Sequence, residues 1–269
     1  MNYFKDKRRE KQFHRCGELG RAWPQLQQWY STSLGQRLAE QEAALLSEAL
    51  TNLFGFHLLQ LGQLGNRDWL NNSRISHCSV MDFMPVPRDE AISGFHGLPD
   101  ALPIQADSID VMVLPHTLEF SLTPHTILRE VDRVLVPEGH LVMLVFNPIS
   151  LWSFWRWMFG WRKRVPWCGR FLSTGRIRDW MALLGFDVKR IHGYFYQLPV
   201  QNKRVAERMG FCEGLGRRCW PFLGAANMIV ATKRVTTLTP VRPRWRAKAK
   251  PVVTPGLIEP FQNKDKHVE

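Results

Sequence analysis

Apolar and polar positions along the chain alternate in blocks that predict strands and helices in turn. Short apolar runs typical of buried strands lie at 54–62, 74–83, 109–114, 140–146, 186–191 and 226–233. Apolar residues spaced three and four apart predict helices at 23–50, 124–135 and 173–184. Strands that alternate with helices indicate a parallel sheet covered on both faces. We therefore expect an open, doubly wound α/β domain.

Composition divides the chain into three predicted parts. Residues 1–50 form an N-terminal helical extension that begins with a polar segment. Residues 51–234 form the α/β domain, with an insert at 148–169 that holds five of the eleven tryptophans. Residues 235–269 are rich in proline and basic side chains, which is typical of an extended arm rather than of a domain.

The chain carries a net charge of +12, and this charge is unevenly distributed. Between Gly214 and Ile258 there are nine Lys or Arg residues and no Asp or Glu. Such a segment attracts an anionic partner, which can be nucleic acid, a membrane surface or an acidic substrate. A solvated tail that aids solubility is the other interpretation.

The cysteines and the lengths of the apolar runs indicate the cellular compartment in which the protein works. The five cysteines are scattered, odd in number and without a CxxC pair, at positions 16, 78, 168, 212 and 219. This pattern argues against a disulfide framework and a zinc site, and it favours a reducing compartment. The N-terminus lacks the apolar run of a signal peptide, and no window reaches the length of a membrane span. We expect a cytoplasmic protein, with contact at a membrane surface as an open alternative.

Ligands of open α/β sheets bind at the carboxyl ends of the strands. In this chain those ends are predicted at Leu61-Gly62, Val80–Phe83, Leu114–His116 and Phe146-Asn147. Each of them carries small or polar residues. The sequence pattern therefore predicts a ligand site at this edge, without naming the ligand.

The segment Gly97–Leu135, with its continuation to Leu141, carries a family resemblance. It is similar to the class I S-adenosylmethionine-dependent methyltransferases of the small-molecule type (type 11), whose pattern is GDAxxLPFxxxSFDxVxxxxxLEH and then DPxxxLxExxRVLKPGGxL. Matching positions are Leu102, Pro103, Ser108, Asp110, Leu118, Glu119, Pro124, Leu128, Glu130, Arg133, Val134, Leu135, Pro137, Gly139 and Leu141. The resemblance extends over residues 55–233. It implies a Rossmann-like, mostly parallel seven-stranded sheet, S-adenosyl-L-methionine as cofactor and a small, hydrophobic substrate.

The first glycine motif departs from that family. The family sequence DLGCGTG corresponds to QLGQLGN at 60–66, where Gln60 replaces the acid and Leu64 replaces the middle glycine. Gln60 can form a hydrogen bond but offers no charge to the ammonium group of the cofactor. Leu64 crowds a turn that glycine eases, and Gly65 is the residue that can restore it. The cofactor site is therefore degenerate at its first motif.

The resemblance implies a set of site residues. Asp82 ends the second strand, where the family places an acid on the ribose hydroxyls. Strict alignment puts Leu98-Pro99 at the adenine position, and Asp100-Ala101 follows two residues later. The implied cofactor contacts are Gln60, Gly62, Gln63, Gly65, Asp82, Asp100, Ala101 and Leu114.

Several residues are candidates for catalysis and substrate binding. His116 follows the fourth strand, where a histidine can act as a general base or simply line the substrate site. Asn147, Trp152 and Trp155 are candidate substrate contacts. Three interpretations of the Trp-rich insert stay open: a lid over a hydrophobic pocket, a membrane-interface segment, or packing on the sheet or a partner chain.

Three functions follow from these observations. The first is an S-adenosylmethionine-dependent methyltransferase acting on a small hydrophobic molecule. The second is a non-catalytic relative with a degraded cofactor site, which binds a partner or a membrane surface. The third is nucleic-acid methylation or binding, but Leu114–Thr117 (LPHT) is not an NPPY tetrad and no nucleic-acid module is recognisable, so only the charge supports it.

Overall fold

The computed structural model describes residues 19–65, 70, 73–84, 93–158, 165–199, 201, 214, 216, 218 and 220–234. The chain divides into two compact units, Met1–Val235 and Thr236–Glu269. The predicted basic tail at 235–269 and the first 18 residues of the predicted N-terminal extension lie outside the described residues.

Seven strands form one sheet in the order β3-β2-β1-β4-β5-β7-β6. All neighbouring pairs are parallel except those that involve β7, which runs antiparallel to β5 and β6. The strands are β1 His57–Leu61, β2 His77–Asp82, β3 Ser93–His96, β4 Ile109–Pro115, β5 Leu135–Phe146, β6 Phe186–Tyr194 and β7 Ala226–Lys233. The predicted fold class, a mostly parallel seven-stranded α/β sheet, is confirmed.

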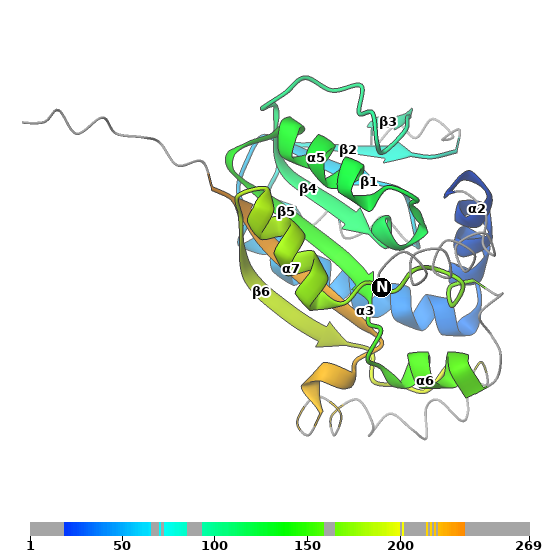
Figure 1. The fold of residues 1–269 in the computed structure, drawn as a ribbon. Helices are drawn as coiled ribbons and strands as arrows, with labels where there is room; N and C mark the ends of the chain where they lie inside the picture. Colours follow the sequence, from blue (N-terminus) through cyan, green and yellow to red (C-terminus); the bar gives the residue numbers. More distant parts are fainter. Residues whose placement is uncertain are drawn as a thin grey trace, which may run out of the picture. The chain divides into compact units, whose positions relative to one another are not determined.

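Helices cover both faces of this sheet. In Figure 1, α5 (Pro124–Val134) and α7 (Thr174–Leu183) lie on the face towards the viewer, and α3 (Ser33–Thr51) lies behind the sheet. Two further helices, α2 (Leu19–Tyr30) and α6 (Leu151–Met158), lie beyond the carboxyl ends of the strands. The central strands β1, β4 and β5 are buried on both faces, which explains why their sequences are continuous apolar runs.

The N-terminal segment differs from the predicted single helix at 23–50. It forms two helices, because Thr32 caps α3: its hydroxyl accepts a hydrogen bond from the amide of Gly35 at 3.2 Å. A Cβ atom on Gly35 would lie 2.3 Å from the carbonyl oxygen of Trp29, so this close turn needs glycine. The break turns α2 away from α3 and towards the ends of β1 and β2.

The matched segment after β3 is held by two charged residues of α5. Glu130 accepts the amide of Leu102 at 3.0 Å, and Arg133 donates to the carbonyls of Leu102 and Ile104 at 3.0 and 2.9 Å. Glu130 and Arg133 also pair with each other at 2.8 Å. These two motif positions therefore have a structural function: they fix the loop that leads into β4.

The cysteines depart from the sequence expectation. Cys78 is a free thiol, whereas Cys168 is disulfide-bonded. The sequence pattern argues against a disulfide framework, and Cys168 departs from that expectation.

Candidate functional site

The turn after β1 keeps glycine where the backbone requires it. Gly62 and Gly65 adopt left-handed conformations, with φ angles of 85° and 64°. Leu64 lies between them with its side chain buried, so the turn absorbs the leucine because Gly65 takes the unusual conformation. The buried amide of Gln60 donates to the carbonyl of Gly62 at 2.7 Å, while its Oε1 atom has no partner among the described residues.

The acid at the end of β2 is bound by the N-terminal helix. Asp82 accepts a hydrogen bond from the indole Nε1 of Trp23 at 2.7 Å and another from the side-chain amide of Gln27 at 3.0 Å. The backbone amide of Phe83 donates to the same carboxylate oxygen as Trp23. Both carboxylate oxygens of Asp82 are thus occupied by groups of the chain itself, two of which come from α2.

The indole of Trp23 also fills the space above the glycine turn. A Cβ atom on Gly62 would lie 2.4 Å from Cζ2 of Trp23 and 2.8 Å from a ring atom of Phe83. The rings of Trp23 and Phe83 meet edge to face, with centroids 4.7 Å apart. Trp23 is 0% exposed. Trp23, which the sequence pattern predicts only as part of a helix, therefore lies at the centre of the candidate site.

This arrangement tests whether the site fits S-adenosylmethionine. The family pattern needs a free acid after β2 for the ribose and free space over the glycine turn for the methionine part. Trp23 takes the place of both cofactor groups, because its N–H group donates to the carboxylate of Asp82 and its ring fills the space over Gly62. In the conformation described, the residues present do not fit the cofactor.

A second group of buried polar residues lies where the family places its reaction centre. His116 follows β4 with a φ angle of 50° and is 0% exposed. Its Nε2 atom lies 2.9 Å from Glu42 of α3, and its Nδ1 atom lies 3.0 Å from Glu119. The hydroxyls of Tyr30 and Tyr194 each donate to Glu42 at 2.9 Å. These five residues, which we name the buried polar network, join α2, α3, β6 and the segment after β4.

The electrostatics of the network fix the charge on His116. Burial alone lowers the pKa of this imidazole, but the carboxylates of Glu42 and Glu119 outweigh burial and raise the pKa from 6.5 to about 9. Burial, together with Glu42, also raises the pKa of Tyr30 and of Tyr194. At neutral pH the imidazolium donates from both nitrogens to carboxylates, so His116 has no free nitrogen with which to accept a proton from a substrate. This geometry does not suit the expected general base.

Aromatic side chains fill the space above the carboxyl ends of β4 and β5. Phe146 stacks on His116 with ring centroids 3.9 Å apart, and the ring centroid of Trp152 lies 6.2 Å from that of Phe146. Trp29 and Trp167 close the group, each within 6.1 Å of Trp152. Trp152 is buried and donates to the carbonyl of Gln197 at 2.9 Å. The expected substrate contact at Trp152 is therefore a core residue in this conformation.

The remaining predicted site residues are not brought together. Asn147 is buried and donates to the carbonyls of Phe222 and Gly224 at 2.7 and 2.9 Å, which ties two loops together. Asp100 and Ala101 are exposed in a turn, Leu114 is buried within β4, and Trp155 is half-buried on α6. Gln63 contributes its carbonyl, which accepts the side-chain amide of Gln27 at 3.2 Å.

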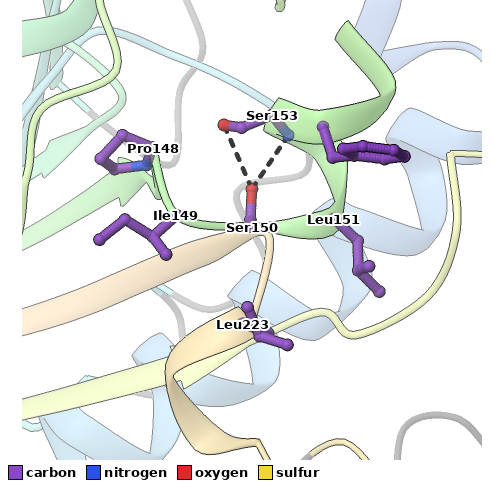
Figure 2. A pocket seen from close by; sticks show the side chains of 7 residues that line it. Pro148, Ile149, Ser150, Leu151, Ser153 and Leu223 are labelled. Atoms are coloured by element: carbon purple, nitrogen blue, oxygen red, sulfur yellow. Dashed lines mark hydrogen bonds between the residues drawn. The ribbon is translucent and has the colours of Figure 1, made fainter. Parts of the chain in front are cut away.

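A shallow pocket of about 380 Å³ opens at the start of α6. Its lining is mostly apolar and consists of Pro148, Ile149, Ser150, Leu151, Ser153, Phe154 and Leu223. Figure 2 shows the hydroxyl of Ser150 hydrogen-bonded to the backbone amide and the hydroxyl of Ser153, which fixes the first turn of α6. The pocket lies outside the aromatic group and opens on the surface.

Three residues that matter here received no site role from the sequence: Trp23, Glu42 and Glu119, of which Glu119 was named only as a matching position of the family pattern. Glu42 had a visible signal, because it stands four positions after Leu38 and four before Leu46 in the apolar stripe of α3. A carboxylate in such a stripe needs a buried partner. Trp23 gave no comparable signal. Among the described residues there is no cluster of metal-binding side chains, and none of the described helices has the length and apolar character needed to cross a membrane.

Comparisons with known proteins agree with the geometry of the fold. A family model described as a methyltransferase domain matches residues 78–143. YafS of Escherichia coli, an uncharacterized protein, is 32% identical over 206 residues, which cover 77% of this chain and 80% of YafS.

Solved structures of low identity share the fold. One is a chain of the complex between the Haloferax volcanii Trm112 methyltransferase activator and a putative methyltransferase, with 17% identity and a TM-score of 0.58 over 79% of this chain and 97% of that chain. Another is a possible histamine N-methyltransferase from Thermotoga maritima, with 16% identity and a TM-score of 0.55 over 83% of this chain and 100% of that one. The chain therefore belongs to the class I S-adenosylmethionine-dependent methyltransferase family, in the same group as YafS.

Proposed function

We propose that this family member is a non-catalytic binding protein in its resting conformation, because its own N-terminal helix takes the place of the cofactor. The observation that carries the proposal is the indole of Trp23, which donates to Asp82 and lies against Gly62. Two further features support it. His116 is held between two carboxylates, and the aromatic group fills the space next to it.

The energetics support the same conclusion. Removing a buried tryptophan side chain from a core costs about 3–5 kcal/mol. A cofactor that has to expel Trp23 therefore binds about 10²- to 10⁴-fold more weakly than it would bind an open site. An intrinsic Kd near 1 μM would become an apparent Kd of about 0.1–10 mM. Such binding is too weak for a constitutive methyltransferase that works at micromolar cofactor.

Isothermal titration calorimetry on the full chain tests this proposal. S-adenosylmethionine and its demethylated product, S-adenosylhomocysteine, are titrated separately into protein whose folding is checked by circular dichroism. We expect no saturable heat below about 0.1 mM, the lower limit of the range worked out above. A saturable isotherm with a micromolar Kd would contradict the proposal.

The second candidate is an active S-adenosylmethionine-dependent methyltransferase acting on a small hydrophobic substrate, with α2 withdrawn. It is favoured by one observation: Gly62 and Asp82 still stand at the family positions, and Gly62 still has the left-handed backbone. Tight cofactor binding by the unaltered chain would favour this candidate over the first. Transfer of a radiolabelled methyl group to an apolar extract would then identify its substrate class.

A further inference from the structure

The helix α6 presents apolar side chains outward as well as inward. Trp152 points into the core and is buried, whereas Leu151, Phe154, Trp157 and Met158 are exposed. Phe154 follows Leu151 by three positions, and Trp157 and Met158 follow Phe154 by three and four, so all four lie on one side of the helix. An outward apolar side on a surface helix indicates a contact with something else.

This side of α6 continues onto a neighbouring segment. The side-chain amide of Asn147, just before α6, donates to the carbonyls of Phe222 and Gly224 in and after η3 (Pro221–Leu223). Ile149 and Leu223 line the same pocket (Figure 2). Together these elements form a surface that we name the apolar face. Its side chains are 40–67% exposed and belong to Ile149, Leu151, Phe154, Trp157, Met158 and Phe222.

The sequence around the apolar face has one sign of charge. From Gly139 to Arg178 there is no Asp or Glu, and there are seven Lys or Arg residues. Phe222 lies between Arg218 and Lys233, and this stretch of the sequence also contains no Asp or Glu. Exposed tryptophan and phenylalanine among basic residues are typical of segments that lie in the interface of an anionic bilayer.

We propose that the apolar face docks on an anionic phospholipid membrane. Apolar side chains of α6 and η3 enter the headgroup boundary, and the flanking basic segments are attracted by the negative surface. This proposal names the partner of the binding protein described under Proposed function. It rests on that proposed function only for the statement that the protein acts by binding. Cofactor calorimetry and membrane binding are measured separately, so each can fail without the other.

Co-sedimentation with vesicles tests the membrane contact. The full chain is mixed with vesicles of equimolar phosphatidylcholine and phosphatidylglycerol, and separately with phosphatidylcholine alone. We expect the protein to sediment with the anionic vesicles and to be released by about 1 M salt, where the Debye length falls to about 3 Å. Equal sedimentation with both kinds of vesicle would overturn the proposal.

Two double variants separate the apolar face from apolar exposure in general. Phe154→Ser with Trp157→Ser removes two anchors of the face, and partitioning should fall by at least about tenfold. Leu122→Ser with Leu183→Ser removes two exposed leucines that lie outside the face and should leave partitioning unchanged. Equal binding by the first variant and the unaltered chain would overturn the proposal. So would a change in oligomeric state, seen by sedimentation velocity, without vesicle binding, because the face would then contact a second copy.

Discussion

Trp23 offers the sharpest perturbation of this molecule, because one side chain both stabilises the fold and fills the candidate cofactor site. Replacing Trp23 with Ala removes a fully buried ring and its hydrogen bond to Asp82. The substitution should lower the free energy of unfolding by about 3–5 kcal/mol. For a domain of this size that corresponds to a decrease in Tm on the order of 6–20 °C.

The same substitution should open the site. The cavity left by the indole is bounded by Gly62, Asp82 and Phe83, which are the positions that the family uses for its cofactor. We expect S-adenosylhomocysteine to bind the Trp23→Ala variant about 10²- to 10⁴-fold more tightly than the unaltered chain, because the cost of expelling the indole is gone. Isothermal titration calorimetry measures the two dissociation constants, and a thermal melt by circular dichroism shows that the variant is folded.

Two control variants make the result interpretable. Trp23→Phe keeps an aromatic ring in the core but loses the bond to Asp82 and the outer ring atoms that meet Gly62, so it should be destabilised by about 1.5–3 kcal/mol and gain less binding than Trp23→Ala. Adding Asp82→Asn to Trp23→Ala should remove most of the gained affinity, since the ribose then loses its charged acceptor. Equal affinity of the unaltered chain and Trp23→Ala would refute the idea that the indole occupies the cofactor position.

Three further predictions concern stability. The pKa of His116 is about 9 in the fold and 6.5 in the unfolded chain, so the protonated imidazole contributes about 3 kcal/mol to the free energy of unfolding. This contribution is complete below pH 6.5 and is lost as the pH rises through 9. Urea titrations at several pH values should show this loss, and His116→Gln should abolish it. Gly62→Ala should cost at least about 2 kcal/mol, because a Cβ meets Trp23 and φ is positive, and an unchanged Tm would contradict this expectation. Asn147→Ala leaves two carbonyls without donors and should cost about 2 kcal/mol or more by chemical denaturation, whereas a change under about 0.5 kcal/mol would show that these bonds are dispensable.

Much of the fold could be predicted from the sequence, because its periodicities are local. Strands such as β4 are continuous apolar runs, and α5 begins at Pro124 and carries its apolar residues at helical spacing. The edge strand β3 has neither property: three of its four residues are exposed, and Phe95 is the one large apolar side chain in it, so no apolar run marks it. The break between α2 and α3 was readable from the Thr32 cap, but the long Ala- and Leu-rich pattern obscured it.

The candidate site could be predicted only in part, because its decisive contacts join distant positions. The family pattern correctly indicates the turn at Gly62 and the acid at Asp82, since both are set by the ends of strands. The contact between Trp23 and Asp82 spans 59 positions, and helical periodicity does not say which groove a buried tryptophan enters. His116 was singled out as a catalytic candidate, but its character depends on Glu42, which lies 74 positions away on another helix.

The position of Glu42 has a consequence for the order in which the chain assembles. Glu42 lies on an early helix, and its bond to Tyr194 spans 152 positions. At about 5–20 residues per second, a ribosome needs roughly 8–30 s to deliver that tyrosine after Glu42. Tyr30 and His116, the other two partners of Glu42, are made before β6, so Tyr194 is the last donor to reach this buried carboxylate. The hydrogen bonds of Glu42 are therefore complete only after most of the sheet has been synthesised.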